Sequence, residues 1–408
     1  MTEQTNTPEL RFPEYKNEWD LKKIGNLANI VRGASPRPIK DSKWFDDNSE
    51  VGWLRISDVT QQNGKIKFLQ QHLSTEGQKK TRVLHESHLL LSIAASVGKP
   101  VINYVKTGVH DGFLIFMKPK FNLYFMFNWL ENFQLKWNKY GQPGSQVNLN
   151  SDLVRSQDIY IPHLYEEQEK IGNFFNKLDR QIELEEQKLE KLEEQKKGYM
   201  QKIFSQQLRF KDENGNDYPE WKKKKLDDVA NYRRGSFPQP YGNKEWYDEK
   251  NGEPFVQVVD VDKNMKLHDK TKQKISDLAK PKSVKGFKGD IVVTLQGSIG
   301  RVALLHYDAY IDRTLLLIDS FKIEMNKNYF KYVLYLLFLK EKERAPGGTI
   351  KTITKKVLSN FKIDIPNVGE QEKIGKFFEK YDECIQKQSD KIGLLKERKK
   401  GFLQKMFV

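Results

Sequence analysis

The stretch Glu167-Gln168-Glu169-Lys170-Ile171-Gly172 returns later in the chain as Glu370-Gln371-Glu372-Lys373-Ile374-Gly375. The two copies begin a longer repeat, in which residues 167–204 align without a gap with residues 370–407 at an offset of 203 residues. Twenty of the 38 aligned pairs are identical. A period this long is typical of a duplicated module rather than of a solenoid. The sequence therefore predicts two modules, each made of a globular region followed by a helix.

Both repeated segments carry an apolar heptad pattern, with apolar residues at alternating steps of four and three. Such a pattern, sustained over nearly five heptads, is typical of a coiled coil. The predicted seam positions are Ile171, Phe175, Leu178, Ile182, Leu189 and Leu192 in the first helix and Ile374, Phe378, Tyr381, Ile385, Ile392 and Leu395 in the second.

The polar seam positions favour an antiparallel pair of helices. In a parallel pair in register, Lys196 would face Lys399, and the like charges would repel each other. In an antiparallel pair Lys196 lies near Tyr381, Lys399 near Leu178, and Glu185 near Ile392, with the lysine stems along apolar surface. The two modules would then be related by a pseudo-twofold axis. The alternative is that each helix packs only on its own globular domain.

The globular halves repeat each other more weakly. Ala28-Asn29-Ile30-Val31-Arg32-Gly33 aligns with residues 230–235, Ile56-Ser57-Asp58-Val59 with residues 258–261, and Ser96-Val97-Gly98-Lys99 with residues 298–301. Between these segments the sequences diverge, as expected for two binding sites of different specificity on one scaffold. The predicted domains are residues 1–165, 166–206 (central helix), 207–368 and 369–408 (distal helix).

Within each half, short apolar runs predict strands and longer amphipathic runs predict helices. The fold class expected is therefore α+β, with two α/β domains and two long helices. The expected strands are 53–56, 89–93, 101–105, 113–117, 255–259, 291–294, 302–305 and 315–318, and the expected shorter helices are 121–130 and 329–339.

The composition favours a polyanionic partner. The formal net charge is +15 and the isoelectric point about 9.3, which favours nucleic acid, although a merely basic protein is the alternative. Cys384 is the single cysteine, so neither an intrachain disulfide nor a cysteine-based zinc site is expected. Residues 1–8 lack the apolar core of a signal peptide, and we expect a cytoplasmic protein.

No familiar catalytic motif occurs in the sequence. Phosphate-binding loops, dinucleotide-binding glycine patterns, zinc-protease and serine-hydrolase motifs and the motif of amino-methyltransferases are all missing. His85 and His88 lack a third partner for a metal. The Gly98-Lys99 and Gly300-Arg301 turns could cradle a phosphate or serve only as structural turns. We expect a chain without catalytic residues and without a metal.

Basic and polar loop residues are the candidates for contact with DNA, because Arg and Lys neutralise phosphates and Arg, Gln and Ser also read base edges. The predicted set is Arg32, Arg37, Lys43, Lys80, Arg82, Lys99, Gln142, Ser145, Gln146, Arg233, Arg234, Lys244, Lys285, Arg301, Thr349 and Lys351.

The arrangement resembles the specificity subunit of type I restriction–modification enzymes. The resemblance covers essentially the whole chain and lies in the two E-Q-x-K-I helices, each following an Ile-Pro, in the Trp19 and Trp221 segments before each variable region, and in the Gly-Lys and Gly-Arg turns. It implies two target recognition domains, each binding one half of a bipartite, asymmetric DNA site. It implies that the helices act as a spacer and dock two methyltransferase subunits.

The same resemblance implies that the chemistry belongs to partners. The methyltransferase subunits would bind S-adenosylmethionine, and up to two restriction endonuclease subunits, using ATP and magnesium, could join. A stand-alone sequence-specific DNA-binding regulator and a nuclease with an unrecognised site are the competing hypotheses. An adjacent methyltransferase gene would favour the first interpretation, and cleavage of DNA by the isolated chain with magnesium would favour the nuclease.

Overall fold

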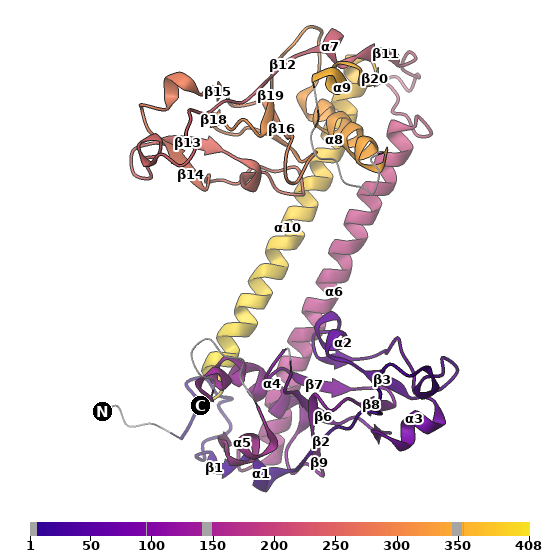
Figure 1. Cartoon of the computed structure of the whole chain (residues 1–408), viewed down its shortest axis with the longest axis vertical. Coiled ribbons are helices and arrows are strands. Elements are labelled where there is room, and N and C mark those ends of the chain that lie inside the picture. The colour runs from indigo at the N-terminus through magenta and orange to yellow at the C-terminus, as the bar shows by residue number, and fades with distance from the viewer. Residues whose placement is uncertain (1–5, 95, 141–148, 345–352, 354) are drawn as a thin grey trace. The chain divides into compact units, whose positions relative to one another are not determined.

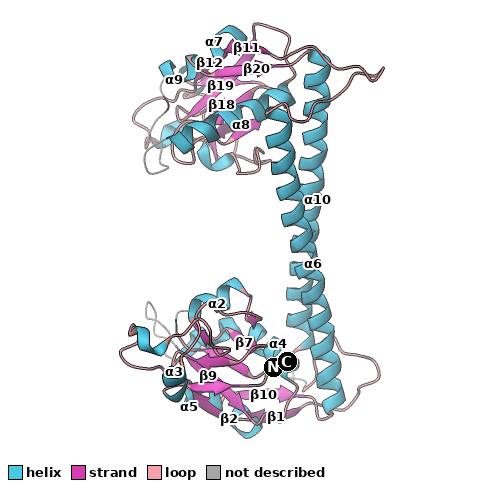
Figure 2. Ribbon diagram, turned by 90° about the vertical axis from the view of Figure 1, so that its right-hand side faces the viewer, coloured by secondary structure: helices cyan, strands magenta, loops and turns pink. Residues whose placement is uncertain are grey.

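The computed structural model describes residues 6–94, 96–140, 149–344, 353 and 355–408. The chain divides into two compact units, residues 1–188 with 389–408, and residues 189–388. Each unit combines a globular domain of mixed strands and helices with one part of each of two long helices, α6 (Tyr165–Phe204) and α10 (Val368–Met406) (Figures 1 and 2).

The first unit contains a five-stranded sheet, a three-stranded sheet and a two-stranded sheet. The five-stranded sheet has the order β2 (Asn29–Arg32), β9 (Phe113–Met117), β6 (Leu89–Ser92), β7 (Pro100–Asn103), β4 (Lys65–Ile66). The three-stranded sheet has the order β3 (Gly52–Leu54), β8 (Thr107–Val109), β5 (Arg82–Leu84). The two-stranded sheet pairs β1 (Asp20–Lys23) with β10 (Asp158–Ile161). The shorter helices are α1 (Ile24–Leu27), η1 (Ser42–Trp44), α2 (Ile56–Gln61), α3 (Thr75–Lys79), α4 (Leu123–Phe133), η2 (Gln134–Tyr140) and α5 (Ser151–Ser156).

The second unit repeats most of this topology, although its two larger sheets have four strands each rather than five and three. Its first sheet has the order β12 (Ala230–Arg234), β19 (Leu315–Phe321), β16 (Ile291–Thr294), β17 (Val302–Leu304). Its second sheet has the order β14 (Gln273–Ile275), β13 (Glu253–Val256), β18 (Ala309–Ile311), β15 (Val284–Gly286). A two-stranded sheet pairs β11 (Lys222–Lys225) with β20 (Lys362–Ile365). Its shorter helices are α7 (Leu226–Val229), η3 (Lys244–Trp246), η4 (Val258–Asp260), η5 (Lys280–Lys282), α8 (Lys327–Arg344) and α9 (Lys355–Ser359). The predicted class, mixed α/β domains with two long helices, is therefore confirmed.

Two predicted strands end earlier than expected. The strands predicted at residues 53–56 and 255–259 stop at Leu54 and Val256, and the chain turns into α2 and η4. The cause is a carboxylate three residues into the turn: Asp58 accepts the N–H of residue 55, and Asp260 accepts the N–H of residue 257, each at 2.8 Å. This bond starts a helical turn and competes with strand pairing.

The repeated glutamates, Glu167 and Glu370, are buried anchors. Glu167 accepts two hydrogen bonds from the guanidinium of Arg11, at 2.6 and 2.8 Å, and a third from the Trp19 indole at 3.2 Å. Glu370 is bound in the same way by Arg209 and Trp221. A bidentate guanidinium satisfies a carboxylate that burial would otherwise make costly. The motif therefore fixes the start of each long helix to its domain.

The repeated glutamine and glycine also have structural roles. The Gln168 amide donates to Pro162 O at 3.1 Å and accepts from the N–H of Asn122, the residue that caps α4. Gly172 lies so close to that cap that an added Cβ would stand 2.7 Å from the Asn122 side chain. Gln371 and Gly375 make the equivalent contacts in the second unit.

The two long helices pair antiparallel within each unit. In the first unit Leu178 and Ile182 of α6 pack against Leu395 of α10, and in the second the Tyr199 ring contacts Phe377 at 5.2 Å. The predicted seam residues Ile171, Phe175, Leu178, Ile182, Ile374, Phe378, Ile385, Ile392 and Leu395 are buried, and Leu189, Leu192 and Tyr381 are partly buried. The antiparallel prediction is confirmed.

The seam lysines are paired with carboxylates that the sequence analysis did not single out. Lys196 contacts Asp382 at 2.5 Å, and Lys399 contacts Asp179 at 2.8 Å. These acids are the immediate neighbours of Tyr381 and Leu178, so the predicted register is correct to within one residue. Burial disfavours the charged amine of Lys399, but Glu131 and Asp179 outweigh it and raise its pKa.

The first unit is assembled from both ends of the chain. The N–H of Leu10 donates to Lys405 O at 2.8 Å, near the end of α10. In the second unit the N–H of Leu208 donates to Lys202 O at 3.1 Å, and Lys202 is the repeat partner of Lys405. In the second unit, the segment that bonds to the end of α6 follows that helix directly in the chain. In the first unit, the corresponding contact joins the N-terminal segment to the end of α10.

Candidate nucleic-acid interface

The candidate site lies where two parallel strands end in each domain. In the first domain β3 pairs in parallel with β8, with Leu54 opposite Val109, so Arg55 and His110 follow at the same sheet edge. In the second domain β13 pairs in parallel with β18, with Val256 opposite Ile311. Gln257 and Asp312 follow there. The topology therefore places different side chains at equivalent positions.

A glycine in each domain lets the backbone cross this edge closely. A Cβ on Gly33 would stand 2.2 Å from the carbonyl oxygen of His110, and one on Gly235 would stand 2.3 Å from that of Asp312. Only glycine tolerates such an approach. The glycine that ends the repeated segments 28–33 and 230–235 therefore shapes the site in both domains.

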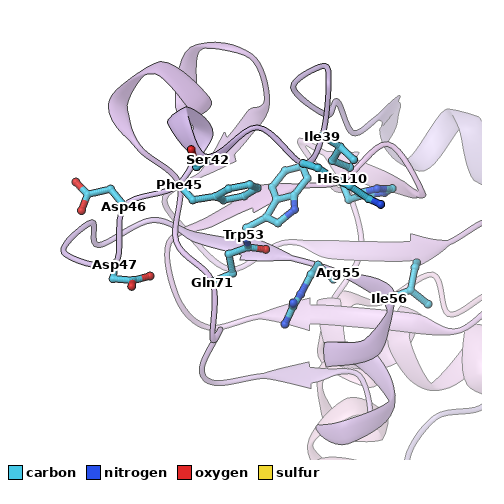
Figure 3. A pocket seen from close by; sticks show the side chains of 11 residues that line it. Ile39, Ser42, Phe45, Asp46, Asp47, Trp53, Arg55, Ile56, Gln71 and His110 are labelled. Atoms are coloured by element: carbon cyan, nitrogen blue, oxygen red, sulfur yellow. The ribbon is translucent and has the colours of Figure 1, made fainter.

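The first domain has an open hollow of about 690 Å³ at this edge. Trp53 lies at its middle, with the His110 ring tilted against the indole at a centroid distance of 5.6 Å (Figure 3). The lining residues are Ile39, Lys40, Ser42, Phe45, Asp46, Asp47, Trp53, Arg55, Ile56, Gln71 and His110. Apolar rings with a few polar groups at the margin are typical of a binding site.

Several polar groups of the hollow are available to a ligand. The Gln71 amide and the Lys40 amine have no hydrogen-bond partner among the residues that the structure describes. The Arg55 guanidinium is held by Asp58 at 3.3 and 3.5 Å and keeps 38% of its side-chain surface exposed. Burial lowers the pKa of His110, against the opposite effect of the Asp111 carboxylate and with help from Arg37 and Arg32. The hollow thus offers hydrogen-bond donors from Lys40 and Arg55 and acceptors from Asp46 and Asp47.

Arginines gather beside the hollow around Asp111. The Asp111 carboxylate accepts from Arg37 Nη2 at 2.6 Å and from Ser35 Oγ at 3.0 Å, and its carbonyl accepts from Arg32 Nε at 2.6 Å. Arg82 Nε donates to Arg32 O at 2.8 Å. The sequence analysis predicted all three arginines as DNA contacts, and the fold brings them together on one exposed surface.

In the second domain aromatic residues occupy the equivalent place. The Tyr241 hydroxyl donates to Asp312 and accepts from Gln257 Nε2 at 3.2 Å, and Tyr247 donates to Tyr241 O at 3.0 Å. Burial and the bond to Asp312 raise the pKa of Tyr241. The Arg313 guanidinium lies over the Tyr241 ring at 5.3 Å. The same backbone therefore presents a different pattern of donors and acceptors.

The other predicted DNA contacts are scattered. Lys43 lies over the Trp44 ring and pairs with Asp41, Arg233 pairs with Asp319, Lys285 pairs with Glu253, and Lys80, Arg234 and Lys244 are exposed. Gln142, Ser145, Gln146, Thr349 and Lys351 lie outside the described residues. None of these contacts is tested by the structure, and they stay predictions.

The Gly-Lys and Gly-Arg turns have the geometry of structural turns. Gly98 and Gly300 adopt φ of 75° and 83°, and their N–H groups donate to Ser92 O and Thr294 O. A Cβ on Gly98 would stand 2.3 Å from the Trp137 ring. Backbone N–H groups already bonded within the protein are not available to a phosphate, so the structural interpretation is favoured.

The sequence analysis missed Arg55, Gln71, His110 and Gln257. A signal for two of them was present, because Arg55 and Gln257 immediately precede the aligned segments 56–59 and 258–261. A differing residue beside a repeated one is the pattern that should have marked them. Gln71 and His110 come near this edge only through strand pairing, which the sequence does not reveal.

The described residues offer no grouping of three His, Cys, Asp or Glu side chains suited to hold a metal ion. Over the same part of the chain, none of the helices combines the length and apolar character needed to cross a bilayer.

Comparison with known proteins is decisive for the family. The family model for the "Type I restriction modification DNA specificity domain" matches residues 16–194 and again residues 218–397. The chain belongs to this family. The two matches cover the two copies of the repeat, so each contains one specificity domain.

One relative of this family matches almost the whole chain, and another matches half of it. A protein of Methanocaldococcus jannaschii assigned as the specificity subunit of the type I restriction enzyme MjaX is 25% identical, over 97% of this chain and 95% of its own length. The specificity subunit of the type I restriction enzyme MjaVIII from the same organism is 24% identical over 50% of this chain and 46% of its own length.

Solved structures support the fold. The S subunit of a type I restriction–modification system from M. genitalium aligns with a TM-score of 0.61 at 15% identity, covering 98% of this chain and 99% of that one. A chain from a structure on complex assembly of the type I R-M system aligns with a TM-score of 0.59 at 18% identity, covering 96% of this chain and 98% of that one. At these identities the likeness concerns the fold alone.

Proposed function

We propose that this member of the specificity family is the DNA-recognition component of a type I restriction–modification complex. Each of its two domains binds one half of a bipartite, asymmetric site in double-stranded DNA. The long helices set the gap between the half-sites and dock two methyltransferase subunits. The chain itself is non-catalytic and acts in the cytoplasm.

One observation carries this proposal: two domains with equivalent parallel strand pairs present different side chains at the same strand ends. A duplicated enzyme would be expected to keep its reactive groups in both copies. A duplicated domain that binds two different DNA sequences would instead keep the backbone fold and vary the side chains that contact the bases. Arg55 against Gln257, and His110 against Asp312, fit the second pattern.

The reaction would depend on partners. Methyltransferase subunits would bring S-adenosylmethionine and extrude the target base, because a base cannot be modified while it is stacked in the duplex. Up to two restriction endonuclease subunits would bring ATP and magnesium. This chain would supply the position on DNA, and the net charge of +15 would favour association with its phosphates.

An exchange of one domain tests the proposal. The segment 20–164 would be replaced by the corresponding segment of another family member, and the hybrid would be co-expressed with its methyltransferase. Sequencing of methylated genomic DNA should then show one altered half-site and one unchanged half-site. A change in both halves would contradict independent domains, and a change in neither would contradict DNA recognition by this segment.

A further inference from the structure

Residues 55 and 257 occupy the same scaffold position in the two domains. Each follows the last residue of a parallel strand, β3 or β13, and precedes a helical turn. Each donates its backbone N–H to a buried aspartate three residues later, Asp58 or Asp260, at 2.8 Å. The backbone at this position is therefore held identically, and only the side chain differs.

The Arg55 side chain is oriented before any ligand binds. Asp58 accepts from its Nε and Nη2, which turns one edge of the guanidinium toward the protein. Nη1 has no partner among the described residues, and the group lines the hollow beside Trp53 (Figure 3). A guanidinium held by a carboxylate loses less conformational freedom on binding and presents its outer edge in a defined direction.

The Gln257 side chain is held by Tyr241. Its Nε2 donates one hydrogen bond to the Tyr241 hydroxyl at 3.2 Å. An amide nitrogen has two hydrogens, so one donor remains, and the Oε1 acceptor has no partner among the described residues. Gln257 therefore retains one donor and one acceptor.

These two residue types match different bases. Arginine forms two hydrogen bonds to the O6 and N7 acceptors of guanine in the major groove, whereas glutamine pairs its acceptor and donor with N6 and N7 of adenine. Neighbouring rings, Trp53 in one domain and Tyr241 in the other, shield the site on one side, which strengthens hydrogen bonds by lowering the local dielectric.

We propose that residues 55 and 257 are specificity-determining positions: Arg55 contacts a guanine in the half-site of the first domain, and Gln257 contacts an adenine in the half-site of the second. The proposal rests on the proposed function, since it assumes that each domain binds one half-site. It goes beyond the proposed function by naming, for each half-site, one residue and the base that this residue recognises.

Reciprocal substitutions test the assignment. Arg55→Gln, Gln257→Arg and the wild type would each be co-expressed with the methyltransferase, and the methylated motif would be determined by sequencing. Arg55→Gln should change or relax one guanine position in one half-site, with discrimination falling about 5- to 150-fold. Gln257→Arg should change one adenine position in the other half. Arg55→Lys should keep the guanine preference.

Lys106→Gln is the matched control, because Lys106 is an exposed cation of the first domain that pairs with Glu50 away from the hollow. It should leave the motif unchanged. Thermal unfolding of each purified variant separates misfolding from altered recognition. A folded, active Arg55→Gln or Gln257→Arg variant with the wild-type motif would overturn the assignment. A wild type without any bipartite motif would instead overturn the proposed function.

Discussion

At the residue scale, a few buried polar groups explain why glutamate begins the repeated E-Q-x-K-I motif. Glu370 has no exposed surface and receives donors from Arg209 and Trp221. The bond to Glu370 raises the pKa of Arg209, which means that the pair favours its charged form. The Leu-Arg-Phe run at residues 10–12 recurs at residues 208–210, and in both copies its arginine binds the buried glutamate.

Replacing Glu370 with alanine should therefore be severe. Glu370→Ala leaves the Arg209 charge and the Trp221 N–H without their acceptor, and breaking a buried ion pair costs about 3 to 5 kcal/mol. Urea unfolding followed by tryptophan fluorescence would measure the loss. Glu220→Ala, at an exposed glutamate, should change the free energy of unfolding by less than about 0.5 kcal/mol. Equal effects would contradict the anchoring role.

Two glycines should respond in opposite directions to the same substitution. Gly33→Ala places a Cβ against the His110 carbonyl and should destabilise the protein by about 1 to 3 kcal/mol. Gly198 lies within α6 with no atom within 4 Å of an added Cβ, so Gly198→Ala should stabilise the helix by about 0.5 to 1 kcal/mol. Chemical denaturation of both variants checks the signs, and destabilisation by Gly198→Ala would be the contrary result.

At the element scale, the pairing of α6 with α10 depends on charged groups within an apolar seam. Asp382 accepts from Lys196, from Lys331 at 3.2 Å and from the Tyr332 hydroxyl at 2.5 Å. The register of the two helices was predictable from the sequence, because only a few alignments bury both apolar stripes and also keep like charges apart. The further charged groups at the seam were not predictable, since Lys331 and Glu131 come from α8 and α4, which only the tertiary fold brings to the seam.

Asp382 should give stability a dependence on acid pH. Burial disfavours its charged form, but Lys331 and Lys196 outweigh burial and lower the pKa below the ordinary 3.8. Its contribution is therefore present above pH 3.8 and is lost as the pH falls through the lower folded-state value. Asp382→Asn should remove this part of the pH dependence, which lies below about pH 4. Unfolding curves that show the same slope in both proteins would refute it.

At the scale of the whole molecule, α6 and α10 each supply one part to each unit. The first unit also needs both chain ends, since Leu10 is bonded to Lys405. The first unit is therefore built from two separate segments of the chain, residues 1–188 and 389–408, whereas the second unit is one contiguous segment, residues 189–388. This arrangement makes the two helices the structural link on which any spacing between half-sites would depend.

Lengthening α6 should alter the gap between the half-sites. An insertion of four residues adds about 6 Å to a helix and nearly preserves its face. We expect the preferred gap to grow by one or two base pairs, since successive base pairs are about 3.4 Å apart along a strand. Methylation sequencing would measure the gap, and an unchanged gap would contradict a role of the helix as a ruler.

The sequence by itself determined the duplication, the two long helices, their antiparallel register and eight of the twenty strands that the described residues form, because these depend on local periodicity and on repetition. Only the tertiary structure determined the strand-end site. Arg55 and His110 are 55 residues apart and line the same hollow because β3 and β8 pair in parallel. Lys331 and Glu131 reach the helix seam from the separate helices α8 and α4. Contacts between distant segments depend on how the sheets pair and pack, which no local pattern encodes.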